Sequence, residues 1–187
     1  YLNLDGVTII GASLGGMLAP RAAAYEKRIK RVIAWSIFPN FFFVVLGMIP
    51  SSLQKAIKIL MLLHAAPILN LVFKMKSKKD STVDWGIKHG MYAYNAKSPY
   101  EYVVKLNEFQ MIDVGHLIDQ DVLVIGANQD HFVDYKLFKE ELDSLSNVHS
   151  LTFRLFTDKE CASNHCNMGN TKLTLDTMIN WIELIKH

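Results

Sequence analysis

Residues 7–16 of the chain read Val7-Thr8-Ile9-Ile10-Gly11-Ala12-Ser13-Leu14-Gly15-Gly16. The run at residues 7–10 is β-branched and ends at a glycine, which favours a buried strand. Residues 14–27 are rich in alanine and favour a helix, and a second short apolar run follows at residues 31–35. A strand, a helix and another strand with short connections predict an α/β fold with a mostly parallel sheet.

A serine lies on the sharp turn between the first strand and the first helix. Residues 11–15 match the pattern Gly-x-Ser-x-Gly in the strand-turn-helix context that this pattern requires. We expect Gly11 and Gly15 to remove side chains that would clash in the strained turn. The hydroxyl of Ser13 would project at the helix N-terminus, where the backbone N–H of Leu14 can stabilise an oxyanion. The alternative is a glycine-rich turn that only packs a helix on a sheet.

The middle of the chain, residues 38–111, has no strand pattern and predicts a helical insertion. Apolar residues recur at helical spacing in two groups, and two pairs of residues are placed as helix N-caps, Ser51/Ser52 and Asp80/Ser81. After residue 119 the α/β pattern returns, with strands expected at residues 122–125 and 151–156. Asp134 can cap the helix between them. Asn170 or Thr171 can cap a last helix with the apolar face Leu175, Met178, Ile182 and Ile185.

A nucleophilic serine needs a base and a carboxylate, and both are expected in loops at the carboxyl ends of later strands. Asp130 follows the strand at 122–125, and His165 follows the strand at 151–156. The rivals Asp121 and His149 precede their strands, and Asp134 fits a helix cap. His131 adjoins Asp130 and so points elsewhere. The remaining histidine rivals are His64, His89 and His116.

These residues resemble those of the α/β-hydrolases, and within them the dipeptidyl aminopeptidase/acylaminoacyl-peptidase and FrsA-like esterases. The resemblance rests on residues 11–16, 122–133 and 165–170, in the order Ser, Asp, His. It implies that Ser13 is the nucleophile, that His165 is general base and then acid, and that Asp130 orients His165. It divides the chain into core residues 1–37, a helical cap at residues 38–111 and core residues 112–187.

Members of this family have a larger sheet than the four strands expected here. The N-terminal half of the family's fold, which precedes the strand before Ser13, is not in this sequence. That half includes the loop that supplies the second oxyanion-hole N–H. We therefore expect either a fragment or a protein whose other half is a separate chain. The strand at residues 7–10 would then expose an edge open to self-association or homo-oligomer formation.

Composition excludes several classes of function. The chain has 187 residues, a formal net charge of +2 and 50% hydrophobic residues, which indicates a folded core and gives no support to nucleic-acid binding. The two cysteines, Cys161 and Cys166, cannot form a disulfide framework, and four ligands at metal spacing are not visible, so we expect no metal. The sequence also has no nucleotide-binding fingerprint, so we expect no cofactor. Prolines and lysines interrupt the apolar residues 37–73, so we expect no membrane insertion. We interpret the lysine-rich residues 74–79 as a solvated turn. A cytoplasmic location is expected.

The predicted function is hydrolysis of a carboxylic ester, or of an amide or peptide, through an acyl-enzyme on Ser13. The partner is thus a small-molecule ester or amide, or a peptide. Carbon–carbon bond hydrolysis, acyl transfer to another acceptor and a non-catalytic binding module on the same fold remain open. Candidate substrate-pocket residues are Trp35, Ser36, Phe38, His131 and Trp85.

Overall fold

The computed structural model describes residues 6–47 and 51–185. The chain divides into two compact units. The sheet unit comprises residues 1–40 and 110–187, and the helical unit comprises residues 41–109.

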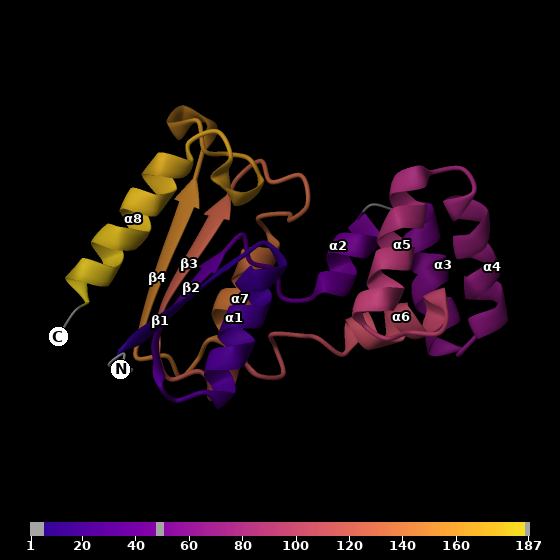
Figure 1. Ribbon diagram of the computed structural model, residues 1–187, viewed down its shortest axis with the longest axis horizontal. Coiled ribbons are helices and arrows are strands. Elements are labelled where there is room, and N and C mark those ends of the chain that lie inside the picture. The colour runs from indigo at the N-terminus through magenta and orange to yellow at the C-terminus, as the bar shows by residue number, and fades with distance from the viewer. Residues whose placement is uncertain (1–5, 48–50, 186–187) are drawn as a thin grey trace. The chain divides into compact units, whose positions relative to one another are not determined.

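Four parallel strands form the sheet unit, in the order β1-β2-β3-β4 (Figure 1). They are β1 (Val7–Ala12), β2 (Ile29–Trp35), β3 (Asp121–Ala127) and β4 (Ser150–Phe156). Because all four run in the same direction, their carboxyl ends meet at one edge of the sheet, which is where a strand-helix fold places its functional loops. The predicted α/β fold with a parallel sheet is confirmed.

Helices cover both faces of this sheet. Helix α1 (Leu14–Tyr25) packs on β1 and β2, and α8 (Thr171–Leu184) lies along the face next to β4 (Figure 1). Alternate residues of a strand point to opposite faces, so the sheet has an apolar core on each side. The core under α8 joins strand residues to two residues of the helix, Met178 and Trp181.

The face that α8 turns to the sheet is largely the predicted one. Met178 is buried and Ile182 and Ile185 pack against the same core, whereas Leu175 is 46% exposed and Thr174 and Trp181 are buried. The indole of Trp181 donates a hydrogen bond to Thr152 Oγ1 at 3.1 Å, which fixes the rotation of the helix on the sheet. The helix starts as predicted, because the Asn170 side chain accepts the N–H of Leu173.

Helix α7 (Leu137–Ser144) begins later than it would if Asp134 were its N-cap. The Asp134 carboxylate accepts the N–H of Lys136 at 3.0 Å, and its carbonyl accepts the N–H of Leu137 at 2.9 Å. Asp134 therefore forms a turn in front of the helix, and the N-cap position belongs to Lys136. The prediction that Asp134 caps this helix is wrong.

The chain leaves the sheet unit and returns to it at neighbouring points. Asn40 and Gln110 form an antiparallel bridge, and the N–H of Met111 donates to the carbonyl of Pro39 at 2.8 Å. The Arg21 guanidinium also donates to the Gln110 carbonyl. Helix α1 thus binds the returning chain, which in turn is bridged to the exiting chain.

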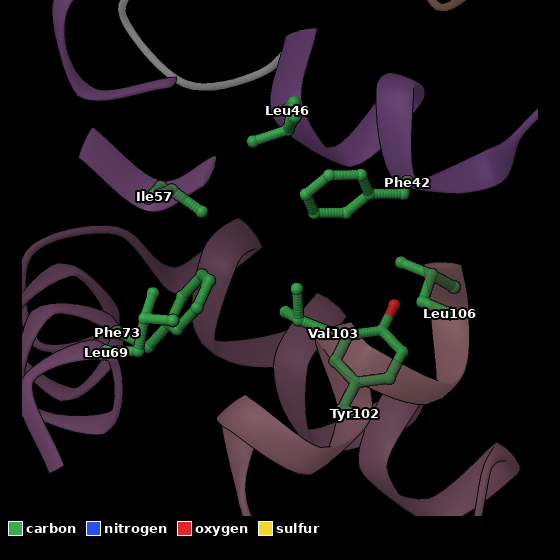
Figure 2. Close-up of a cluster of buried hydrophobic side chains, with 8 residues drawn as sticks. All are labelled: Phe42, Leu46, Ile57, Leu69, Phe73, Tyr102, Val103 and Leu106. Atoms are coloured by element: carbon green, nitrogen blue, oxygen red, sulfur yellow. The ribbon is translucent and has the colours of Figure 1, made fainter. Parts of the chain in front are cut away.

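The helical unit contains α2 (Phe41–Gly47), α3 (Ser51–Leu62), α4 (Ala66–Ser77), α5 (Ser81–Ala93) and α6 (Pro99–Asn107). Figure 2 shows its core, which is made of Phe42, Leu46, Ile57, Leu69, Phe73, Tyr102, Val103 and Leu106. Asp80 caps α5 as predicted, with its carboxylate accepting the N–H groups of Thr82 and Val83. Helix α3 begins at Ser51, and the residues just before it lie outside the described part of the chain. Among the described residues, no helix is both long enough and apolar enough to cross a membrane.

Candidate active site

Ser13 lies at the carboxyl end of β1, immediately before α1. Its backbone has φ 56° and ψ −122°, a conformation that costs a non-glycine residue about 1–3 kcal/mol. The turn is held in place because the N–H of Ser13 donates to the Trp35 carbonyl at 2.9 Å. A Cβ on Gly11 would lie 1.8 Å from the carbonyl oxygen of Gly15, so the turn requires glycine at position 11.

The second close approach involves Gly16 rather than Gly15. Among the described residues, a Cβ on Gly15 would have no atom within 4 Å, so the steric reason expected for this glycine is wrong. A Cβ on Gly16 would lie 2.8 Å from the carbonyl oxygen of Trp35. The start of α1 therefore contacts the end of β2 through Gly16.

Ser13, His165 and Asp130 form a continuous hydrogen-bonded series within the sheet unit. His165 Nε2 lies 2.9 Å from Ser13 Oγ, and His165 Nδ1 lies 2.8 Å from Asp130 Oδ2. The carboxylate can only accept a hydrogen bond, so Nδ1 carries the proton and a neutral His165 presents Nε2 as an acceptor to the hydroxyl. The Asp130 side chain is fully buried and that of His165 is 15% exposed.

Two backbone N–H groups hold the Asp130 carboxylate in this position. Asp130 Oδ1 accepts from Phe132 at 2.9 Å and from Val133 at 3.1 Å, which leaves Oδ2 for the imidazole. The Phe132 ring meets the His165 ring edge to face, with centroids 4.9 Å apart. Sequence reasoning missed Phe132, although its place two residues after Asp130 was a usable signal.

The loop that carries His165 is fastened to the end of β2. The Ser36 hydroxyl accepts the N–H of Cys166 at 2.8 Å, and the Trp35 indole donates to Asn167 Oδ1 at 2.9 Å. Asn167 also donates to the Ala162 carbonyl across the same loop. Cys166 and Asn167 both have positive φ, so the loop turns sharply just after the histidine. These contacts fix the position of His165, and sequence reasoning missed them.

The predicted pocket residues have different surroundings. Ser36 is fully buried and Phe38 is 1% exposed, and Trp35 is engaged with Asn167. The His131 ring lies beside His165, with centroids 6.1 Å apart. Trp85 belongs to the helical unit, where it stacks on His89 at a centroid distance of 5.2 Å. A substrate-binding role for these five residues stays a prediction.

The rival carboxylate and histidine lie at the opposite ends of their strands. Asp121 starts β3 and accepts from His149 Nδ1 at 2.8 Å and from the Ser150 hydroxyl. Asp121 and His149 line a cleft of about 430 Å³ together with Lys27, Ile29, Lys30, Asp119 and Gln120. Ser13 does not line this cleft.

Two shifted pKa values mark the site. The hydrogen bond to Asp130, aided by one from Cys166, raises the pKa of His165 to about 9. Burial raises the pKa of the Cys166 thiol, but hydrogen bonds to His165 and Ser36 outweigh this effect, and the net pKa is lowered. Cys161 and Cys166 are both free thiols, and no group of three metal-binding side chains occurs within residues 6–47 and 51–185.

The parallel sheet, the strained serine turn and the serine–histidine–aspartate geometry define a recognisable class. The chain belongs to the family described as alpha/beta hydrolase fold, whose profile matches residues 1–158. No curated protein sequence matches the chain.

Solved structures with the same fold include several hydrolases. A 2,6-dihydroxy-pseudo-oxynicotine hydrolase is 18% identical, with a TM-score of 0.58 over 97% of this chain and 40% of that one. Acetyl xylan esterase 1 from Thermoanaerobacterium sp. JW/SL YS485 is 18% identical, with a TM-score of 0.55 over 99% of this chain and 47% of that one. A Mycobacterium smegmatis proline iminopeptidase is 14% identical, with a TM-score of 0.56 over 96% of this chain and 66% of that one. The chain thus spans 40–66% of the length of these three structures.

Proposed function

We propose that this chain carries the catalytic triad of a serine hydrolase that acts through an acyl-enzyme. The observation that supports the proposal most directly is the pair of contacts made by His165, 2.9 Å to Ser13 Oγ and 2.8 Å to Asp130 Oδ2. An activated nucleophile, a base and a group that orients the base are the three parts such a reaction needs.

In the proposed mechanism, Ser13 Oγ attacks the carbonyl carbon while its proton passes to His165 Nε2. The resulting imidazolium is stabilised by the buried Asp130 carboxylate. The N–H of Leu14, the first residue of α1, has no carbonyl one turn earlier to bind and can donate to the oxyanion. His165 then protonates the leaving group. A water molecule deprotonated by His165 hydrolyses the acyl-enzyme and regenerates Ser13.

The proposed substrate is a carboxylic ester, with an amide or peptide as the second choice. Solved structures of the same fold include both an acetyl xylan esterase and a proline iminopeptidase, which is the support for both classes. The proposed subgroup remains the dipeptidyl aminopeptidase/acylaminoacyl-peptidase and FrsA-like esterases. For the helical unit, inserted between β2 and β3, we propose the role of a cap, as the resemblance implies.

Hydrolysis of p-nitrophenyl esters with acyl chains of increasing length tests the proposal. Ser13→Ala should lower kcat by about three orders of magnitude or more, whereas Ser146→Ala, at an exposed serine of the same unit, should leave it unchanged. Hydrolysis that survives Ser13→Ala would overturn the proposal. The chain alone can be inactive if it is a fragment, so absence of ester and amide hydrolysis is not sufficient by itself. If, in addition, a fluorophosphonate probe does not label Ser13, the binding-module alternative would replace the proposal.

A further inference from the structure

The α3–α4 hairpin of the helical unit leaves apolar side chains exposed. Helix α3 packs against α4 (Figure 1). Both helices contribute side chains to the same buried cluster, namely Ile57, Leu69 and Phe73 (Figure 2). Six apolar side chains of the hairpin are nevertheless more than half exposed, namely Ile59, Leu62, Leu63, Ile68, Leu71 and Met75. We call these six residues the apolar hairpin surface.

In α4 this exposure follows a regular pattern. Ile68, Leu71 and Met75 recur at i, i+3 and i+7, so they form one stripe along the helix. Leu69 and Phe73 form a second stripe on the buried side. A helix that is apolar on both sides requires something to cover the second side, either protein or lipid.

The tip of the hairpin is its most exposed apolar part. Leu62 is 79% exposed and Leu63 is 68% exposed, and Ile68 follows after a tight turn. The turn is held by the N–H of Ala65 donating to the Leu60 carbonyl at 2.8 Å and by a contact of 3.1 Å between His64 Nδ1 and the Tyr100 hydroxyl. The tip therefore presents its leucines on a fixed backbone.

The charge around this surface has one sign. The sequence contains no Asp or Glu between Glu26 and Asp80, yet α3, α4 and the following turn carry six lysines, Lys55, Lys58, Lys74, Lys76, Lys78 and Lys79. Within the described residues, no carboxylate forms an ion pair with any of the six. Their positive charge is thus available to an anionic partner.

Lysines lie next to the apolar residues along both helices. Lys58 directly precedes Ile59 in α3, and Lys74 directly precedes Met75 in α4. A helix in the plane of a bilayer surface buries its apolar face about 5–10 Å into the boundary between headgroups and acyl chains. The long side chains of neighbouring lysines can then extend back to the level of the phosphates.

Lys58 also lies over the Phe43 ring, 5.4 Å from its centroid, but no lysine of this group has a carboxylate partner among the described residues. From the unpartnered apolar stripe, the exposed tip and these lysines we infer that the α3–α4 hairpin docks on the surface of an anionic lipid bilayer. Docking is peripheral, because no described helix can span the bilayer. A second copy of the chain is a poor occupant, since a symmetric contact would bring six lysines against six lysines. The inference does not depend on the proposed hydrolase activity.

Vesicle sedimentation of the 187-residue chain tests this inference. We expect binding to vesicles with about one third phosphatidylserine in phosphatidylcholine, weaker binding at higher salt, and little binding to phosphatidylcholine alone. Leu62→Ser combined with Leu71→Ser should lower the partition coefficient about tenfold or more. Lys74→Glu combined with Lys78→Glu should lower it to a similar extent or further.

Two matched controls distinguish binding through this surface from non-specific binding to vesicles. Tyr92→Ser removes an apolar side chain that is 86% exposed on α5, and Lys136→Glu with Lys159→Glu removes the same charge from exposed positions of the sheet unit. Neither control should change the partition coefficient by more than about twofold. Circular dichroism of each variant verifies that it is folded.

Three results would overturn the inference. The first is no binding to phosphatidylserine vesicles, and the second is equal loss in the hairpin variants and their controls. The third is a lipid-free dimer, detected by sedimentation velocity, that Leu62→Ser with Leu71→Ser converts to monomer, because the surface would then be a contact between copies of the chain.

Discussion

His165 is in contact with a hydroxyl on one ring nitrogen and with a carboxylate on the other. The carboxylate stabilises the charged imidazolium, which is why the pKa is raised to about 9. A base must be neutral to accept the Ser13 proton, so this same contact moves the active form of the site to higher pH.

We therefore expect kcat/KM for a p-nitrophenyl ester to rise with pH up to an apparent pKa of about 9. Asp130→Asn removes the largest cause of the raised pKa, so the midpoint should fall towards the usual value for histidine while kcat drops by about 10⁴. The pH profile of both proteins is the measurement. A wild-type midpoint near that of free histidine, or the same midpoint in Asp130→Asn, would contradict the account.

Glu141 on α7 is a second unusual residue. It is fully buried, and within the described residues neither carboxylate oxygen has a hydrogen-bond partner. Burial, aided by the neighbouring Glu140, raises the pKa of Glu141 well above its ordinary value. Glu141 is thus protonated in the folded chain over a pH range in which it is ionised in the unfolded chain.

The consequence for stability has a definite sign. Above the unfolded pKa, near 4.5, the unfolded state gains free energy by ionising Glu141, so the native state loses up to about 1.4 kcal/mol for each pH unit. Glu141→Gln cannot ionise, so its stability relative to wild type should improve as the pH rises above 4.5. Urea unfolding across this pH range measures the difference, and a difference that stays constant with pH would refute the assignment.

The site residues could be predicted only in part from the sequence. Asp130 and His165 could be placed near Ser13 because each follows a strand whose apolar run is clear, and parallel strands put such positions at one edge. Ser36 and Asn167 were not assigned their positioning contacts, since nothing in the sequence shows that a buried hydroxyl binds the N–H of a residue 130 positions away. Such contacts arise from tertiary packing, which has no local pattern.

At the scale of elements, the start of α1 depends on how closely a helix can approach a strand. Gly15 and Gly16 are consecutive residues of this helix, but only a Cβ on Gly16 would meet backbone, 2.8 Å from the Trp35 carbonyl oxygen. Replacing each glycine by alanine is therefore a matched comparison. The change in helix propensity is the same at both positions, but only the Cβ at position 16 is crowded.

We expect Gly15→Ala to be neutral or to stabilise the fold by up to about 1 kcal/mol, the usual gain of alanine over glycine in a helix. Gly16→Ala should destabilise it, since α1 must shift away from β2 to relieve the contact with Trp35. Thermal unfolding of the two variants decides the matter. Equal Tm changes would show that the contact at Gly16 is unimportant.

The apolar face of α8 was predictable from periodicity except at one position. Met178, Ile182 and Ile185 pack against the core as predicted, whereas Leu175 is exposed. Thr174 is buried because its hydroxyl donates to the Asn170 carbonyl one turn earlier, which satisfies the polar group inside the core. Trp181 is held by its hydrogen bond to Thr152, and neither contact could be found by counting apolar residues.

At the scale of the whole molecule, topology brings together residues that are 152 positions apart in sequence. Ser13, Asp130 and His165 follow β1, β3 and β4, and the loop after β2 supplies Ser36 to hold the histidine segment. Each of the four strands thus ends in a loop that contributes to one site. The all-parallel sheet is the reason, and its strands were predictable because their apolar runs are short and separated by helical segments.

The most direct test of this account is the labelling of Ser13 by a small fluorophosphonate, with the adduct located by mass spectrometry. We predict one adduct, at Ser13, formed at a rate that falls about a thousandfold or more in His165→Ala and is unchanged in Ser146→Ala. An adduct elsewhere in the chain, or labelling of Ser13 at the same rate in His165→Ala, would contradict the claim that His165 activates this serine.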